Sequence, residues 1–416
     1  MAIFGALSSG RSGLIINGAG LSVIGNNIAN VGTIAFKGSR TEFADLISAE
    51  AGGQIGKIGL GARIATVRTL FEQGAIEATG RSLDLAIEGQ GFFVLRDGQA
   101  QVFTRAGNFQ RNANGSITNG LGYVLQGTPV NASGAPIGAL QDVNVSGITS
   151  QANPTSRVTL SGNLDAQATV PAAFDSTSFA TAYATASFPT SVQIFDSLGT
   201  THDLTLFFRK AGTNTWEVFM GVDAGETGGT PGALQIINGG GGTITFNPDG
   251  SVNAVAGLTG SVTFSGASAQ TIDLNLDGFT QVAGPSGLNA VTHDGYGAGG
   301  LVSLTVNTVG ILSATFDNGQ TRPLYQLGIA SFRNNEGLIP SGNQVYRASI
   351  DSGPPAIAVA QSQGNGSVLG SALEQSNVQI AQAFIDLIST QRAFQANARV
   401  ITASDQLLGD LINIIR

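Results

Sequence analysis

A seven-residue apolar repeat at the C-terminal end of the chain constrains the fold more than any other feature. Its positions are Leu373, Ile380, Leu387, Phe394, Ile401, Leu408 and Ile415. An interleaved series that begins at Phe384 is half polar, so one seam is strictly apolar and its neighbour is mixed. Such a repeat is typical of a helix that packs along its length against other helices.

Ser371 marks the expected start of this helix. The segment from Ser371 to Glu374 matches a capping box, with Ser371 as the N-cap and Glu374 as the third helical residue. No proline follows before the end of the sequence. The pattern therefore predicts one helix of about 45 residues, roughly 65 Å long.

The first thirty residues keep the same spacing but contain many glycines. The apolar positions are Leu7, Leu14, Leu21, Ile24 and Ile28. Each glycine in a helix costs up to about 1 kcal/mol relative to alanine, and isolated helices are marginal even without this handicap. We expect this segment to become helical only by packing against the C-terminal helix, with its glycines allowing a close approach.

The sequence between the two helices is typical of β-structure. Alternating apolar residues and short apolar runs such as Phe92 to Leu95 are separated by turn signals, for example Asp97-Gly98. Glycine-rich stretches near both ends resemble connectors, with one short strand expected at 63–70. The middle of the chain is acidic: residues 151–293 hold three basic and ten acidic residues, while the flanks are nearly neutral.

The predicted fold is mixed and mainly β, with a nested architecture. The N- and C-terminal helices pair as a coiled-coil-like α domain, followed inward by an antiparallel β domain and an inserted β-barrel or sandwich. The expected division is 1–32 with 371–416 (terminal helical core domain), 33–70 with 353–370 (connectors), 71–147 with 294–352 (inner β domain) and 148–293 (inserted outer β domain).

Charge and composition argue against several classes of function. The net charge is −8 and no basic stripe is present, so nucleic acid is a poor partner. The chain has no cysteine, which excludes thiol catalysis and cysteine-based metal sites. No apolar run approaches the ~20 residues that span a bilayer, and the N-terminus lacks the pattern of a signal peptide. We expect no membrane insertion. If the protein is exported, we expect the export to proceed without a cleaved leader.

The residues that enzymes use are not arranged for catalysis. The two histidines, His202 and His293, have no second metal ligand near them in the sequence. Asp273 and Asp277, in strand-like sequence, would lie about 13 Å apart, too far for a retaining carboxylate pair, and we interpret them as turn residues. The glycine-rich loops lack the Lys-Ser/Thr of a phosphate loop. The sequence predicts a protein that is not an enzyme and has no catalytic, cofactor or metal site.

Several blocks resemble the bacterial flagellar rod and hook axial proteins. Residues 24–30 (IGNNIAN) with 36–40 (FKGSR) resemble the N-terminal signature of this family, although Ala35 stands where glycine is common. Residues 83–93 and 104–109 look like its shared β motifs, and 376–378 with 391–398 like its C-terminal helix. The insert, with 189–199 and 216–218, is similar to that of the hook members.

The resemblance implies a structural subunit that self-assembles into a flexible, curved tube outside the cell. This tube would act as a universal joint that carries motor torque from rod to filament. The terminal helices would line its core, and the β domains would face outward. Implied partners are further copies of the chain, the rod, hook-cap and hook–filament junction proteins, and the flagellar type III export apparatus. The alternatives are a distal-rod-type axial protein or a secreted β-rich adhesin or hydrolase.

We expect the assembly interface to lie on the apolar stripes at both ends of the chain. Asn26, Asn27 and Asn30 are either polar groups that fix the register between copies or a plain C-cap cluster. The full set is Leu7, Leu14, Leu21, Ile24, Ile28, Asn26, Asn27, Asn30, Leu373, Ile380, Phe384, Leu387, Phe394, Ile401, Leu408 and Ile415.

Overall fold

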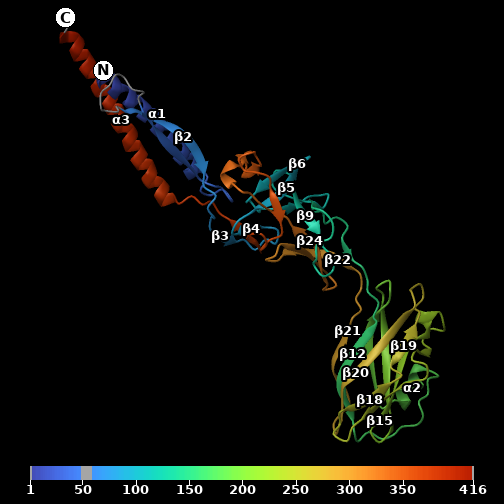
Figure 1. Cartoon of the computed structure of the whole chain (residues 1–416). Coiled ribbons are helices and arrows are strands. Elements are labelled where there is room, and N and C mark those ends of the chain that lie inside the picture. Colours follow the sequence, from blue (N-terminus) through green and yellow to red (C-terminus); the bar gives the residue numbers. More distant parts are fainter. Residues whose placement is uncertain (1, 48–58, 415–416) are drawn as a thin grey trace. The chain divides into compact units, whose positions relative to one another are not determined.

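The computed structural model describes residues 2–47 and 59–414, and the side chains of 5–46 and 61–409 (Figure 1). The chain divides into two compact units. Unit 1 comprises Met1–Gly147, Ser303–Thr315 and Thr321–Arg416, and unit 2 comprises Ile148–Val302 and Phe316–Gln320. Most elements are strands in antiparallel sheets, and three α-helices occur in the described residues. The prediction of a mainly β fold with helices at both ends is confirmed.

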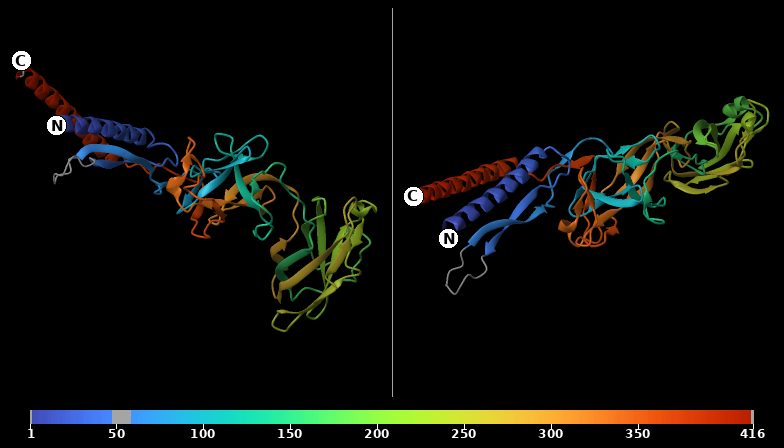
Figure 2. Two further views of the ribbon diagram at one scale, coloured as in Figure 1. Left: turned by 45° about the horizontal axis from the view of Figure 1, so that its top comes forward. Right: turned by 90° about the horizontal axis from the view of Figure 1, so that it is seen from above.

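The two terminal helices of unit 1 lie side by side. They are α1 (Ala2–Ala29) and α3 (Ile380–Ile414), and their pairing is visible in each view of the chain (Figure 2). Four of the six glycines of α1 face α3: a Cβ atom on Gly13 would lie 2.6 Å from the Asn397 side chain, and one on Gly10 would lie 3.1 Å from Ile401. Side chains of α3 therefore fill the space that α1 leaves empty.

The predicted start of the C-terminal helix is wrong. Ser371 has φ +57, and residues Ala372–Glu374 form strand β30, which pairs antiparallel with β3 (Ile76–Ala78). Helix α3 begins at Ile380 and is 35 residues long. The capping box does not form because the carboxylate of Glu374 is buried and binds Lys37 instead.

The connector expected at 33–70 is largely a β-hairpin. Strands β1 (Ser39–Ile47) and β2 (Gly59–Thr69) pair antiparallel, with irregularities in register, and both contact α1. The backbone N–H of Ala62 donates to Ser12 Oγ of α1 at 3.2 Å. The strand expected at 63–70 is confirmed as part of β2, whereas β1 was not expected. A two-stranded hairpin is marginal by itself, so packing against α1 stabilises it. The glycines at 52, 53 and 56 lie outside the described residues.

The remaining strands of unit 1 form its β body. Part of the main sheet has the order β23-β24-β9-β5-β6-β27-β26, and Asp97-Gly98 makes the predicted turn between β5 and β6. Phe92, Phe103 and Tyr346 belong to its core. The strands are β4 (Leu85–Glu88), β5 (Phe92–Asp97), β6 (Ala100–Thr104), β7 (Gln110–Arg111), β8 (Ile117–Thr118), β9 (Val124–Pro129), β10 (Gln141–Asp142), β23 (Ile311–Phe316), β24 (Thr321–Leu327), β25 (Ile329–Ser331), β26 (Ile339–Pro340), β27 (Val345–Arg347), β28 (Ala356–Ala358) and β29 (Ser367–Gly370), with the 3₁₀ turn η2 (Asn335–Gly337).

Unit 2 is built on two open sheets that share one core. Their orders are β19-β20-β12-β21 and β13-β14-β15-β17-β18, and β12 pairs parallel with β20. Trp216, Leu160 and Phe279 are among the buried core residues that both sheets supply. Neither sheet closes into a barrel, so the barrel alternative is not seen in the described chain.

The elements of unit 2 alternate buried and exposed residues where one sheet face covers the core, as in β12. They are β11 (Thr149–Ser150), β12 (Arg157–Asp165), α2 (Phe179–Thr185), β13 (Phe188–Phe195), β14 (Thr201–Gly212), β15 (Thr215–Asp223), η1 (Ala224–Thr227), β16 (Leu234–Ile236), β17 (Gly242–Phe246), β18 (Val252–Ala256), β19 (Thr259–Val262), β20 (Gln270–Val282) and β21 (Gly287–His293), and β22 (Gly299–Val306) continues along the chain into unit 1.

Candidate assembly site

The apolar positions predicted for assembly differ in their exposure in unit 1. Those of α1 are half-buried, as are three of α3, and Phe394 of α3 is 37 % exposed. Ile380 and Phe384 are about half exposed, Leu373 is buried in β30, and Ile415 lies outside the described residues. The half-buried positions are Leu7, Leu14, Leu21, Ile24, Ile28, Leu387, Ile401 and Leu408.

One face of α3 carries large apolar side chains that the described chain leaves uncovered. Its members follow the helical spacing and are Ile380 (51 % exposed), Phe384 (48 %), Ile385 (60 %) and Ile388 (48 %). We call these four residues the α3 patch. Clustered exposed apolar residues, unlike scattered ones, commonly mark a protein–protein contact. The heptad pattern predicts two of these residues, Ile380 and Phe384, but not Ile385 and Ile388.

The predicted asparagine cluster has two different roles within the chain. Asn30 Nδ2 donates to the backbone oxygen of Asn26 at 2.9 Å, and Asn30 Oδ1 accepts from Thr33 Oγ1, which is C-cap geometry. Asn27 instead joins α1 to β1: its Nδ2 donates to Ser39 O at 2.7 Å, and its Oδ1 accepts from Ser39 N at 2.9 Å. These bonds engage both polar ends of the Asn27 amide inside the subunit.

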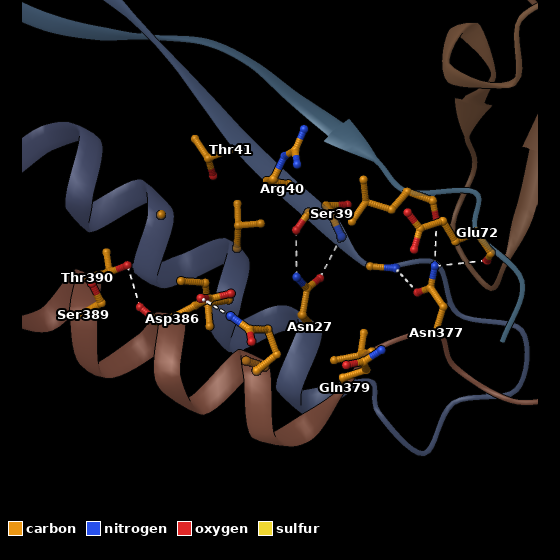
Figure 3. A pocket seen from close by; sticks show the side chains of 18 of the residues that line it. Asn27, Ser39, Arg40, Thr41, Glu72, Asn377, Gln379, Asp386, Ser389 and Thr390 are labelled. Carbon is orange, nitrogen blue, oxygen red and sulfur yellow. Dashed lines mark hydrogen bonds between the residues drawn. The ribbon is translucent and has the colours of Figure 1, made fainter. Parts of the chain in front are cut away.

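Asn377 makes the corresponding link from the segment before α3. Its Oδ1 accepts from Gly38 N at 2.8 Å, and its Nδ2 donates to Leu70 O at 2.8 Å (Figure 3). Asn27 and Asn377 therefore hold the base of the β1–β2 hairpin from two sides. Sequence analysis noted Asn377 only as part of a family motif.

A buried ion network lies next to this base. Lys37 Nζ is 2.6 Å from Glu374 Oε1, and both side chains are 0 % exposed. Arg105 Nη1 lies 3.5 Å from the other carboxylate oxygen, and its guanidinium stands over the Phe92 ring. The N–H of Gly74 also donates to Glu374 Oε1, at 2.9 Å. We call Lys37, Arg105 and Glu374 the buried triad.

The buried triad joins three distant parts of unit 1. Lys37 follows α1, Arg105 belongs to the β body, and Glu374 precedes α3. Burial lowers the pKa of Lys37, and the charge of Glu374 opposes that shift. The triad could not be predicted from local patterns, because its three residues are far apart in the sequence. A lysine inside the motif at 36–40 was the one signal for it.

The stability of unit 1 is expected to fall as the pH rises through the titration of Tyr346. Burial, with a further contribution from Glu374, raises the pKa of Tyr346 from 10.0 to about 12. The neutral phenol is thus favoured in the folded state. Its contribution to the free energy of unfolding is complete below pH 10 and is lost as the pH rises from 10 towards 12. A shift of this size corresponds to roughly 3 kcal/mol.

Urea unfolding followed by far-UV circular dichroism at pH 9 and pH 11 would measure this loss. Tyr346→Phe removes the titrating group and keeps the ring, so its unfolding free energy should fall less between the two pH values. Equal pH dependence of the wild type and the variant would contradict the prediction.

A groove with a volume of about 560 Å³ opens between α1, β1 and α3. Val23, Ile24 and Val378 give it apolar walls, and Asp386 and Glu72 place carboxylates at it. Figure 3 shows the polar side chains of β1 and α3 on its two sides. The Thr41 hydroxyl, on the β1 side, is buried without a hydrogen-bond partner among the described atoms. The groove thus combines apolar walls with polar groups able to bind a partner.

The described residues include no set of three or more side chains suited to holding a metal. In unit 2, His202 lies between Glu226 (Nδ1–Oε2 2.8 Å) and Asp196 (Nε2–Oδ2 3.3 Å) and stacks on Phe264. Asp273 is a strand residue of β20 rather than the expected turn residue, and it pairs with Arg157 at 3.4 Å. Among the described helices, none has the length and apolar character to cross a membrane.

Comparisons with known proteins find similarity to flagellar proteins along most of the chain. Family models match residues 86–180 (Flagellar hook protein FlgE/F/G D1 domain), 163–296 (Flagellar basal body protein FlaE D2 domain) and 369–414 (Flagellar basal body rod FlgEFG protein C-terminal). The flagellar hook protein FlgE of Escherichia coli (strain K12) is 34 % identical over 98 % of this chain and 100 % of its own length.

The chain is also similar to a second hook protein sequence and to a solved hook protein structure. The flagellar hook protein FlgE of Borreliella burgdorferi is 32 % identical over 98 % of this chain and 99 % of its own. The crystal structure of Helicobacter pylori flagellar hook protein FlgE2 aligns with a TM-score of 0.49 and 15 % identity, covering 72 % of this chain and 100 % of that one.

Proposed function

Since this chain belongs to the flagellar hook protein family and is a structural subunit of the hook, we propose that its copies associate through the α3 patch. The observation that carries this proposal is the exposure of four large apolar residues on one helical face. Full burial of one such side chain contributes about 1.5–3 kcal/mol. A contact that covers the α3 patch would therefore supply much of the association free energy.

We also propose a role for each domain of the chain in the assembled tube. Helices α1 and α3 would form the core of the tube, the β body of unit 1 the inner β domain, and unit 2 the outer domain. The family supports export through the flagellar type III apparatus and contacts with rod, hook-cap and junction proteins. The outer domains would slide during rotation while the helical core holds.

The hook assignment is favoured over the alternatives because hook relatives match 98 % of this chain, including the middle segment. The expected shorter rod relatives would lack so large an insert. An adhesin or a hydrolase finds no support in these relatives.

The purified full chain is expected to form curved tubes, visible by negative-stain microscopy, above a threshold concentration. The double variant Phe384→Glu/Ile388→Glu should raise that threshold at least ~10-fold, because burial of the exposed half of both side chains contributes roughly 1.5–3 kcal/mol in total and ~1.4 kcal/mol corresponds to a factor of ten. Its circular dichroism as a monomer should match the wild type, since both side chains are already half exposed.

A matched control replaces two apolar residues of similar exposure in unit 2, Val255 and Val282 (40 % and 49 %), with glutamate. This control should assemble near the wild-type threshold. Normal tubes from the α3 double variant at the wild-type concentration would refute a role for the patch. Discrete particles instead of tubes from the wild type would refute assembly by this chain alone.

A further inference from the structure

The α3 patch and the groove lie on opposite faces of α3 at the same level of the helix. Phe384 belongs to the patch, and Gln382, two residues earlier, lines the groove. Two residues correspond to about 200° around a helix of 3.6 residues per turn. Each copy thus presents an apolar projection on one side and a groove on the other.

The groove suits an apolar side chain with a polar neighbour. Ile24 and Val378 offer apolar contact surface, and its volume of about 560 Å³ lies in the range of ligand-binding clefts. The unpartnered Thr41 hydroxyl is a second sign that the groove is incomplete in a single chain, because buried polar groups normally have a hydrogen-bond partner.

Charge complementarity identifies the occupant as a second copy of this chain. Arg392 lies one helical turn beyond Ile388 on the patch side and makes no ion pair among the described residues. Asp386 and Glu72 stand at the groove. The offset that places Ile388 against Gln382 of a neighbouring copy also places Arg392 against Asp386. Arginine–carboxylate pairs add both energy and geometric specificity.

We propose that the α3 patch of one copy docks into the groove of the next, which rests on the association through the α3 patch proposed above. The two surfaces differ, so the contact is heterologous and leaves a free patch and a free groove after each addition. Heterologous contacts generate rings or open helical assemblies, whereas a self-complementary contact stops at a dimer. The geometry thus explains directional growth into a tube.

Cysteine cross-linking tests this contact sharply, because the chain has no native cysteine. Two full-length single variants, Ile388→Cys in the patch and Gln382→Cys in the groove, are assembled separately and as an equal mixture. Each is then treated with a short bismaleimide and analysed on a denaturing gel. The mixture should yield covalent dimers at least several-fold above either variant alone, and no larger species, since each chain carries one thiol.

Charge reversal provides an independent measurement on the same material. Arg392→Glu added to the Ile388→Cys chain should lower the dimer yield several-fold. Asp386→Arg added to the Gln382→Cys partner should restore it, because the pair is then reversed in sign. Restoration distinguishes a specific contact from loss of folding.

The outcomes separate this inference from the hook function itself. Tubes without enrichment of dimers in the mixture overturn the docking and leave hook assembly intact. Efficient dimers from Ile388→Cys alone also overturn it, because they indicate patch-to-patch contact. Failure of the unmodified chain to form tubes would instead count against the proposed assembly.

Discussion

Replacing Glu374 by glutamine is expected to lower the free energy of unfolding of unit 1 by about 3–5 kcal/mol. Glu374 neutralises Lys37 at 2.6 Å and faces Arg105, and its side chain is fully buried. Glutamine keeps the shape but removes the charge, so two buried cations lose their common anion. Breaking a buried ion pair on one side is costly because the remaining charge keeps its desolvation penalty.

The single tryptophan makes this prediction measurable unit by unit. Trp216 is fully buried in the core of unit 2, so its fluorescence reports on unit 2, while far-UV circular dichroism reports on both units. Glu374→Gln should shift the dichroism transition of unit 1 and leave the fluorescence transition in place.

Glu336→Gln is the matched control for this charge removal. Glu336 pairs with Arg68 at 3.3 Å, but its side chain is 48 % exposed, and such surface pairs contribute about 0–1 kcal/mol. If Glu374→Gln costs no more than this control, the buried triad does not stabilise unit 1.

Phe208→Ala is expected to lower the free energy of unfolding of unit 2 by about 3–5 kcal/mol. Phe208 is fully buried, and its ring contacts Phe188 and Phe279, so it joins β14 to residues of both sheets. Removing the ring leaves a cavity and ends these aromatic contacts. The Trp216 fluorescence transition should move to lower denaturant concentration.

The same experiment tests whether the two units unfold separately, which is a proposal. A matched control, Phe43→Ala, removes a phenylalanine that is 47 % exposed on β1 of unit 1 and should leave the fluorescence transition unchanged. If Phe208→Ala moves the unit 1 transition by the same amount, the two units unfold as one.

Local patterns in the sequence identified much of the fold. The apolar repeats predicted helices at both termini, and turn chemistry such as Asp97-Gly98 located a hairpin. These features depend on residues within a few positions of one another. Only part of β2 in the β1–β2 hairpin was predicted, because both strands gain stability from α1, which contacts them.

The candidate site was predictable only in part for the same reason. The repeat placed Ile380 and Phe384 on an apolar seam, but it did not distinguish the side of α3 that α1 covers from the side that stays exposed. Nor did it reveal the groove, which three elements build together. Exposure is a property of the packed structure, and the groove exists only after β1 lies beside both helices.

Periodicity and turn residues act locally, and they were enough to predict helices at both chain ends with a β-rich, acidic segment between them in the sequence. The start of α3, by contrast, depends on contacts between distant residues. The sequence pattern of Ser371 and Glu374 matches a capping box, yet Glu374 binds Lys37, which is 337 positions away in the sequence. A buried carboxylate must be neutralised by a cation wherever the chain brings one, and this requirement outweighs a cap that contributes about 1 kcal/mol.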